Sequence, residues 1–456
     1  MVKLFRDIKE LFHLSVPLVI SSVSITILGF LSIPILGNFS VNAMAAAAVT
    51  ASIHLILINV FLAAYLGFRV LGSKALGRKA YLDVQNLFSS MITSSFFIGL
   101  VLCCFLSHAS YQIIKIYHLS PEVSDLSIRM MKIYAMCYPV IAFNQSLASL
   151  FFINQKTKIC MSFSIVGEVV GIALAFALVH GFYMIKGIGA TGVAVAAFIQ
   201  QLTELILYLY AFRRQFGTIK IRANFNFQHW KRIYSISFPS IISMFFDYLG
   251  TLLIFFMIAN FLNIEELASG RIAFSISLFF FSIICSLSSG FFILGAKSLG
   301  NNMPDVMIEK AKANQLLLST ASVLMGTTLC FLSTAALSIF TKFETVQNNL
   351  KSLLVYVALS TFLISIWYNF SVILRIFEKT KYEMFANIFS IWCIQIPAAY
   401  ALGIECRMGI NGFFIGVIMA DISYFILNSI GVFNLLRNSL LSGGGKKLCH
   451  KGPLIH

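Results

Sequence analysis

Long apolar runs separated by short polar segments dominate this chain. The runs are continuous rather than alternating, and each is long enough to cross a bilayer, which takes about 20 helical residues. Because lipid offers the backbone no hydrogen-bond partners, continuous apolar runs of this length predict helices. The pattern therefore predicts an all-α membrane protein with twelve transmembrane helices, at 12–36, 44–68, 85–108, 130–152, 159–183, 188–211, 233–260, 267–293, 313–340, 352–374, 383–404 and 409–436.

The second half of the chain repeats the first. Residues 71–77 (LGSKALG) return as 294–300 (LGAKSLG), and Pro17 returns as Pro239. Each half holds six predicted spans, so both halves start from the same side of the membrane. We therefore expect two six-helix bundles related by a pseudo-two-fold axis along the membrane normal, an arrangement typical of transporters whose site lies between the repeats.

The polar segments mark the expected boundaries. The segment 213–232 is the only long polar stretch in mid-chain, and the residues after 437 show no apolar period. We expect an N-terminal six-helix lobe at 1–212, a cytoplasmic linker at 213–232, a C-terminal six-helix lobe at 233–437 and a cytoplasmic tail at 438–456.

Composition and charge agree with a membrane protein. Charged residues make up 11% of the chain, against roughly 25% in soluble domains. The net charge of +16 could suggest a nucleic-acid partner, but 25 of the 33 Lys and Arg residues fall on one set of alternate loops. This positive-inside pattern explains the basicity without nucleic acid. We expect a multi-pass protein of the cell membrane, the inner membrane in a bacterium, with both termini in the cytoplasm.

No sequence motif indicates a bound cofactor or an enzymatic activity. The nine cysteines form no C-x-x-C pair, and the eight histidines form no H-E-x-x-H motif. No nucleophile with an adjacent base is evident. We expect no metal, no cofactor and no enzymatic activity.

Several short motifs recur in order along both halves. They are 37–40 (GNFS) and 43–48 (AMAAAA) after Pro17, the G-x-x-x-x-G turns at 72–77 and 295–300, the segment 373–381 (ILRIFEKTK), and the glycine turns at 187–194 and 409–412. Together these motifs resemble the multidrug and toxic compound extrusion (MATE) transporters, a family within a superfamily that also contains lipid-linked saccharide flippases. The resemblance covers nearly the whole chain and implies export of an organic compound in exchange for H⁺ or Na⁺ by alternating access.

Four acids lie in the interior of the predicted spans, where an ionisable group costs at least about 2.5 to 3.5 kcal/mol. They are Glu168, Glu204, Asp247 and Asp421. Asp247 lies in mid-span, eight residues after Pro239, where the resemblance places a glutamate that couples cation entry to substrate exit. We expect Asp247 to couple ions to transport; the alternative is a carboxylate with a structural partner.

The first half departs from the family pattern. The position of the first-span aspartate is Ser32, and the asparagine and aspartate of span five fall on Gly171 and Ala175. Glu168 lies two helical turns before Ala175 on nearly the same face. Glu168 is the candidate ion-coupling substitute, and a hydrogen bond between packed helices is the alternative.

Two further features concern spans five and six. Glu204 lies nearer the end of its span and is expected to pair with Arg213 or Arg214. The G-x-x-x-G spacing of residues 167–171 predicts close helix packing.

Four residues are candidates for a substrate cavity: Asp421, Asn369, Tyr368 and Arg271. Asp421 would attract cations. Tyr368 and Asn369 either line the cavity or hydrogen-bond neighbouring helices. Arg271 stands where the family usually has glutamine, and it either reaches the interface or faces the cavity and favours an anionic substrate.

Three prolines, Pro17, Pro34 and Pro239, lie in or near the first spans of the two halves. Proline removes a backbone donor and bends a helix. We expect these residues to serve as hinges, with helix-start geometry as an equal explanation for Pro17 and Pro239.

Two functions stay open from the sequence. A cation-coupled exporter of amphipathic organic cations fits Asp247 and Asp421, whereas a flippase for a lipid-linked saccharide fits Arg271 and the missing first-half acids. A flippase of that kind should carry several mid-span cations, and nearly every Lys and Arg lies at a span end, which favours the exporter. Expected partners are a small-molecule substrate and membrane lipid, and the chain is expected to act as a monomer.

Overall fold

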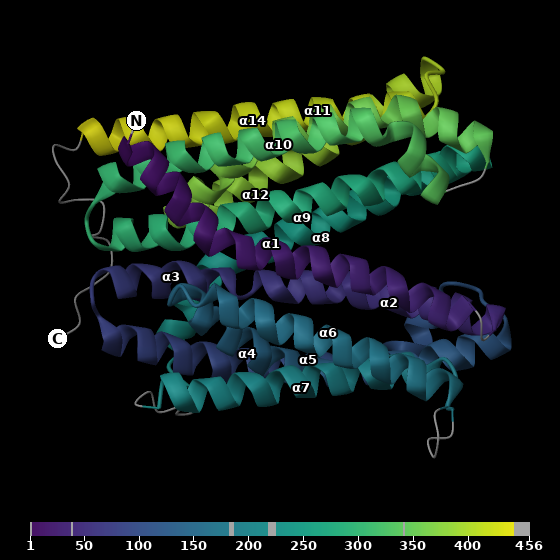
Figure 1. Cartoon of the computed structure of the whole chain (residues 1–456), viewed down its shortest axis with the longest axis horizontal. Coiled ribbons are helices and arrows are strands. Elements are labelled where there is room, and N and C mark those ends of the chain that lie inside the picture. The colour runs from purple at the N-terminus through teal and green to yellow at the C-terminus, as the bar shows by residue number, and fades with distance from the viewer. Residues whose placement is uncertain (1, 38–39, 182–186, 218–224, 341–342, 442–456) are drawn as a thin grey trace. The chain divides into compact units, whose positions relative to one another are not determined.

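The computed structural model describes residues 2–37, 40–181, 187–217, 225–340 and 343–441, and every regular element in them is helical (Figure 1). The linker residues 218–224 and the tail from residue 442 lie outside the described residues. The elements are α1 (Val2–Gly37), α2 (Val41–Ala63), α3 (Leu66–Gly77), α4 (Tyr81–Lys115), α5 (Pro121–Ile153), α6 (Thr157–His180), α7 (Thr191–Gln215), α8 (Phe227–Phe261), α9 (Ile264–Gly300), α10 (Pro304–Phe340), α11 (Glu344–Ile376), α12 (Thr380–Phe389), η1 (Ser390–Gln395), α13 (Ile396–Tyr400), η2 (Ala401–Glu405) and α14 (Ile410–Leu441).

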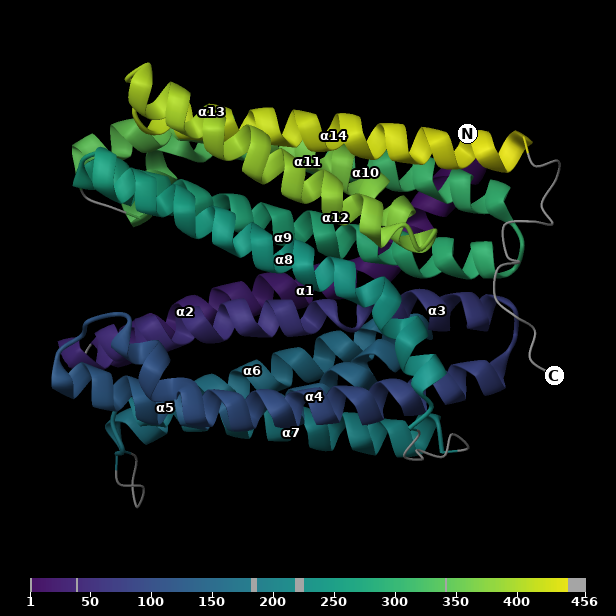
Figure 2. The ribbon, with the colours of Figure 1, turned by 180° about the vertical axis from the view of Figure 1, so that it is seen from behind.

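The twelve predicted spans are recognisable in this order. The pair α2 and α3 forms one stretch, and so does the run from α12 through η2, which Figure 2 shows beside α14. Ten helical stretches within the described residues are long and apolar enough to cross a membrane, and α1 and α10 supply the other two predicted positions. The prediction of an all-helical multi-pass membrane protein is confirmed.

The chain divides into two compact units, one of residues 20–235 and one that joins residues 1–19 to 236–456. The division follows the sequence repeat except in α1 and α8, the first helix of each half. Residues 1–19 of α1 group with the C-terminal helices, and residues 227–235 of α8 group with the N-terminal helices. The units thus differ from the lobes expected at 1–212 and 233–437.

Polar side chains hold the start of α1 within the C-terminal unit. The Nζ atom of Lys310 on α10 lies 2.6 Å from Glu10 Oε2 and 3.7 Å from Asp7 Oδ1. Ser15 Oγ donates to the carbonyl of Leu287 at 2.5 Å. Lys310 and Asp7 are both buried. These contacts therefore attach the first turns of α1 to α9 and α10 of the second half, and not to the other helices of the first half.

The start of α8 is held in the N-terminal unit in a comparable way. Tyr234 donates from its hydroxyl to Ser94 Oγ of α4 at 3.0 Å. The Nδ1 atom of His229 lies 3.4 Å from Ser90 Oγ of the same helix. Both first helices therefore begin in one unit and continue in the other.

The sequence repeat is visible in the backbone packing of each unit. A Cβ atom at Gly72 would lie 2.8 Å from Ile153 Cδ1, and one at Gly295 would lie 3.0 Å from Ile376 Cδ1. The two glycines are 223 residues apart, and so are the two isoleucines. The conserved register therefore preserves a close approach of α3 to the end of α5, and of α9 to the end of α11.

The repeated glycine turn has a steric cause. Gly189 and Gly409 adopt positive φ values of 65° and 59°, a conformation that favours glycine. Gly192 and Gly412 follow them, and a Cβ atom there would lie 2.8 Å from the backbone carbon of Leu178 and 2.4 Å from the backbone nitrogen of Gly403. Each turn therefore lets a helix start against the backbone of the helix before it.

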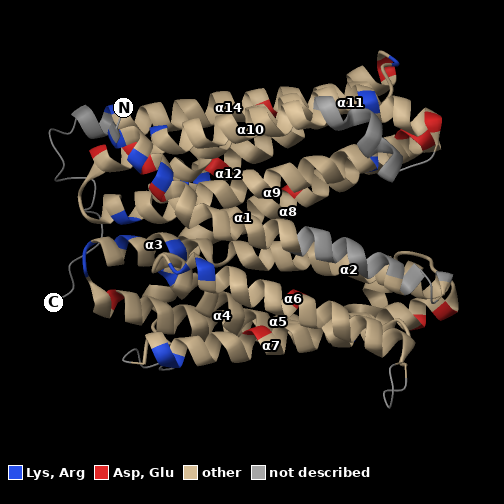
Figure 3. Cartoon of the chain, viewed as in Figure 1, with Lys and Arg blue, Asp and Glu red and all other residues tan. Residues whose placement is uncertain are grey.

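In each unit, most Lys and Arg residues gather at one end of the helices (Figure 3). The middle of the helices is nearly free of cations in the described part of the chain, as expected for segments that cross a membrane.

Gly412→Ala should destabilise the protein, because its new Cβ atom would meet backbone atoms of Gly403 that cannot move independently. We expect a loss of about 1 to 3 kcal/mol, as for overpacked cores, measured by thermal unfolding in detergent. Gly326→Ala is the control: its Cβ atom would meet Ala358 Cβ at 3.5 Å, and alanine favours helix by about 0.8 to 1.0 kcal/mol. Equal stability of the two variants would contradict the steric account.

Candidate functional site

Asp421 lies buried between α11 and α14 with two hydrogen-bond donors. Ser360 Oγ donates to its Oδ2 at 2.6 Å, and Trp367 Nε1 donates to its Oδ1 at 3.0 Å. The Trp367 ring contacts the Tyr424 ring in a tilted arrangement, with 4.6 Å between the ring centres. The structure shows no cation beside this carboxylate within the described residues. Asp421 is thus an acid held by neutral donors in an aromatic surrounding.

Asn369 and Tyr368, the next candidates, connect helices of the C-terminal unit. Asn369 accepts from Asn314 Nδ2 at 2.8 Å and donates to the carbonyl of Ala311 at 3.1 Å. The Tyr368 ring meets the Phe281 ring edge-on at 5.9 Å. Both candidates are buried, and their observed partners fit the helix-to-helix alternative.

Asp247 differs from these residues because it is exposed on the surface of α8. No hydrogen bond or ion pair to its carboxylate occurs within the described part of the chain. An unpaired acid in the middle of a spanning helix is costly in lipid. Among the four in-span acids named from the sequence, Asp247 is thus the one that is exposed and has no protein partner in the described residues.

In the N-terminal unit, Glu168 and Glu204 approach the same amide. Gln200 of α7 donates to Glu168 Oε2, and Glu204 lies one turn after Gln200 on the same helix. Glu204 is only 8% exposed, and its expected ion pair with Arg213 or Arg214 is absent from the described residues. Two carboxylates thus lie near one neutral amide.

The G-x-x-x-G segment of α6 makes room for this cluster. A Cβ atom at Gly167 would lie 2.6 Å from Glu204 Cγ, and one at Gly171 would lie 2.6 Å from Gln200 Oε1. The predicted close packing is confirmed, with α7 as the partner. Ala175, where the resemblance expects an aspartate, is buried and apolar.

The sequence analysis missed a buried ion pair between Arg375 at the end of α11 and Glu383 in α12. Arg375 donates from Nε to Glu383 Oε1 at 2.8 Å and from Nη2 at 2.5 Å. Ser371 Oγ donates to the same oxygen at 2.5 Å. Glu383 is the first residue of the span expected at 383–404, and the sequence analysis assigned it no role. The signal was the opposite charges of Arg375 and Glu383 on either side of a short turn.

This ion pair has no counterpart in the first half. At a displacement of 223, Phe152 stands in the place of Arg375 and Cys160 in the place of Glu383. Arg69 supplies the cation there: its Cζ lies 5.0 Å from the centre of the Phe152 ring, and its Nε donates to Ser149 Oγ at 3.0 Å. The two units thus repeat the same helices but carry different charged residues at equivalent positions.

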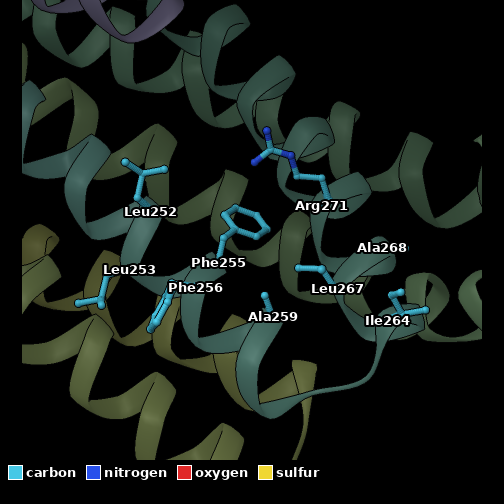
Figure 4. A pocket seen from close by; sticks show the side chains of 9 residues that line it. All are labelled: Leu252, Leu253, Phe255, Phe256, Ala259, Ile264, Leu267, Ala268 and Arg271. Atoms are coloured by element: carbon cyan, nitrogen blue, oxygen red, sulfur yellow. The ribbon is translucent and has the colours of Figure 1, made fainter. Parts of the chain in front are cut away.

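Arg271 lies in a pocket of about 910 Å³ between α8 and α9 (Figure 4). Apolar side chains form the rest of the wall, among them Leu252, Phe255 and Leu267. The Arg271 Cζ atom lies 5.0 Å from the centre of the Phe255 ring. Of the four residues expected in a substrate cavity, Arg271 lines this pocket, and the other three do not.

The expected hinge residues Pro17 and Pro239 are buried within continuous helices. Pro17 lies two residues before the division in α1 between residues 19 and 20, and Pro239 lies just after the division in α8 between residues 235 and 236. Pro34 lies in α1, and its side chain, like that of Ser32, falls outside the described residues.

The fold and these embedded polar groups define a polytopic helical membrane protein built from two repeated units. The MatE family model matches residues 17–177 and 239–401. Since the match covers more than half of the chain, the protein belongs to the MatE family.

Similar proteins cover the chain almost from end to end. The multidrug resistance protein MdtK of Yersinia enterocolitica is 24% identical over 95% of this chain and 96% of its own length. A probable multidrug resistance protein NorM of Xylella fastidiosa is 22% identical over 91% of this chain and 89% of its own. The crystal structure of the Vibrio cholerae MATE transporter VcmN in the bent form superimposes with a TM-score of 0.87, at 16% identity, over 97% of this chain and 99% of its own.

Glu383→Gln should destabilise the protein, because it leaves Arg375 charged without a counter-ion. Removing one partner of a fully buried ion pair costs roughly 3 to 5 kcal/mol. Because the Arg375 side chain is 26% exposed, we expect a loss toward the lower end of this range, which thermal unfolding in detergent would measure. The control is Asp125→Asn, which removes an exposed pair with Arg129 at 2.6 Å. Such pairs contribute under about 1 kcal/mol, so a loss no larger than the control's would contradict a buried pair.

Proposed function

We propose that the protein is a secondary active multidrug efflux transporter that exports amphipathic organic cations in exchange for H⁺ or Na⁺. Its membership of the MatE family and its full-length similarity to proteins named for multidrug resistance support this function. The single observation that carries ion coupling is Asp247, an exposed carboxylate in mid-helix that has no partner among the described residues. The protein acts as a transporter and not as an enzyme.

Asp247 binds the coupling ion in this mechanism. Its carboxylate has no protein donor or cation to satisfy it in the described residues, so a proton, Na⁺ or a cationic substrate neutralises it. Because one carboxylate cannot hold the inorganic ion and the organic cation at once, occupancy by one releases the other. This exclusion couples the two fluxes.

Glu168 and Glu204 form a second ion-coupling group in the N-terminal unit. Gln200 donates to Glu168 and lies one turn before Glu204, but it supplies no positive charge. Two neighbouring carboxylates share a site favourably when a proton or a metal cation lies between them. The pair replaces the acids that the resemblance expects at Ser32 and Ala175.

The conformational change uses α1 and α8. Each helix begins in one unit and continues in the other, and a proline lies near each crossing. Proline lowers the cost of bending at these points because its backbone donates no hydrogen bond. Pro17 and Pro239, with Pro34 further along α1, are the hinges of alternating access.

The protein lies in the cell membrane, the inner membrane in a bacterium, with both termini in the cytoplasm. The gathering of Lys and Arg at one helix end in each unit supports this orientation (Figure 3). We expect a monomer surrounded by lipid. A flippase for lipid-linked saccharides is disfavoured because nearly every Lys and Arg lies at a span end, and acids pair with two of the less exposed cations there, Arg375 and Lys310.

Asp247→Asn should abolish export, since an amide cannot exchange a proton or bind Na⁺ as an anion does. The measurement is ethidium movement in proteoliposomes under an imposed H⁺ gradient and, separately, an imposed Na⁺ gradient. Glu265→Gln, which neutralises an exposed acid in the first turn of α9, should retain the wild-type rate. Unimpaired, gradient-driven transport by Asp247→Asn would remove Asp247 from the mechanism.

Glu204→Gln tests the second ion group. We expect the initial rate of export to fall at least about tenfold, a rise of about 1.4 kcal/mol in the barrier, with ethidium binding unchanged. Glu122→Gln is the matched control, because Glu122 is an exposed acid that accepts from Asn42 at 2.9 Å. A wild-type rate and ion requirement in Glu204→Gln would leave the cluster with a packing role only.

A further inference from the structure

We propose that the pocket between α8 and α9 binds an amphipathic organic monoanion, whose anionic group pairs with Arg271 and whose apolar body lies along the pocket wall. This inference does not rest on the proposed export of cations. It concerns binding to one unit of the protein, and it can hold whether or not the protein transports.

The size and lining of the pocket suit a small amphipathic molecule. Its volume of about 910 Å³ falls within the roughly 300 to 1,000 Å³ of small-molecule sites, which are mostly apolar with a few polar groups that fix orientation. Leu252, Phe256 and Ile264 are 54%, 63% and 76% exposed. The pocket is therefore accessible from the surface of the C-terminal unit, and a ligand can cover these side chains.

Arg271 is the only charged residue of the wall. Its guanidinium extends over the Phe255 ring (Figure 4), with 5.0 Å from Cζ to the ring centre. A ring contact of this kind covers one face of a guanidinium and leaves the N–H groups at its edge free to donate. Those donors match the geometry of a carboxylate, sulfonate or phosphate.

The protein supplies no counter-ion for Arg271 within the described residues. The nearest acids in sequence are Glu265, an exposed residue six positions earlier, and Glu266, whose carboxylate accepts from Asn263 at the start of α9 and from the backbone of Ile410 at 2.9 Å. Asp247 on α8 lies eight residues, about 12 Å of helix, before Phe255. None of the three pairs with Arg271.

Arg271 is exposed, and it differs from two less exposed cations of the C-terminal unit, which have acids beside them. Arg375 has Glu383 at 2.5 Å, and Lys310 has Glu10 at 2.6 Å. A cation in a membrane span normally pairs with another group, and an unpaired one marks a ligand pathway or site. The missing partner of Arg271 is therefore an anion that comes from outside the chain.

The pocket defines the chemical class of the ligand, which could come from either of two sources. It carries one anionic group, a carboxylate, sulfonate or phosphate, on an aromatic or aliphatic body. A dianion is disfavoured because the wall offers only one cation. The ligand reaches the pocket either from the bilayer, as a fatty acid or anionic phospholipid, or from water as a small organic acid.

The test uses the full-length protein in nanodiscs of zwitterionic phosphatidylcholine, with pyrenebutyrate as the anionic probe and pyrenebutanol as its neutral match. Binding is measured by equilibrium dialysis, with empty nanodiscs subtracted. We expect saturable binding of the anion, at least about tenfold weaker in Arg271→Gln, as the loss of a charge-assisted hydrogen bond predicts. Binding of the alcohol should not change.

Matched variants separate charge, volume and folding. Arg129→Gln removes an arginine eight residues into α5 that pairs with Asp125, much as Arg271 lies seven residues into α9, and it should bind like the wild type. Arg271→Lys should retain most of the anion binding. Ala268→Trp should fill the pocket and weaken both probes. The thermal unfolding midpoint of each variant checks its fold.

Competition identifies the source. Displacement of pyrenebutyrate by phosphatidylglycerol added to the nanodisc would assign the site to a bilayer lipid, and displacement by naphthoate alone would assign it to a small organic anion; either result supports the proposal. Lack of saturable binding in the wild type, or equal affinity in Arg271→Gln, would overturn it. Neither of these results would bear on ethidium export, which the Asp247→Asn experiment tests separately.

Discussion

A polar group that leaves water inside a bilayer must find its partner within the protein, and this constraint shapes the whole chain. It makes every spanning segment helical, because only helices satisfy their own backbone. It also sorts the embedded side chains. Arg375 and Lys310 have acids beside them, and Asp421 has two neutral donors. Asp247 and Arg271 lack such partners in the described residues, and these two residues carry the proposals for function.

The two halves share their close glycine contacts but differ in the positions of their charged residues. Gly72 and Gly295 contact isoleucines at equivalent positions, and the glycine turns meet the preceding helix in both halves. At Gly192 and Gly412 the neighbours are backbone atoms, and at Gly72 and Gly295 they are the ends of isoleucine side chains; each position leaves little room for an added carbon. In contrast, Phe152 and Cys160 stand where the second half has Arg375 and Glu383. The two halves therefore carry different polar groups. The first half has a pair of carboxylates near Gln200, and the second half has single acids and a pocket lined by one arginine.

The first helix of each half connects the two units. Lys310 holds the start of α1 in the C-terminal unit, and Ser94 holds the start of α8 in the N-terminal unit. A motion of one unit must therefore pass along a continuous helix. The prolines near the two crossings are the points where such a helix bends at least cost.

The sequence by itself determined the helical class, the twelve spans, the repeat and the resemblance to the family, because apolar length and glycine spacing are local properties of the chain. It also predicted the close packing at Gly167 and Gly171. Only the tertiary structure decided which polar groups have partners, since pairs such as Arg375 with Glu383, or Lys310 with Glu10, join different helices. The same reason explains why Glu168 of α6 accepts from Gln200 of α7, and why Arg271 alone of the expected cavity residues lines the apolar pocket.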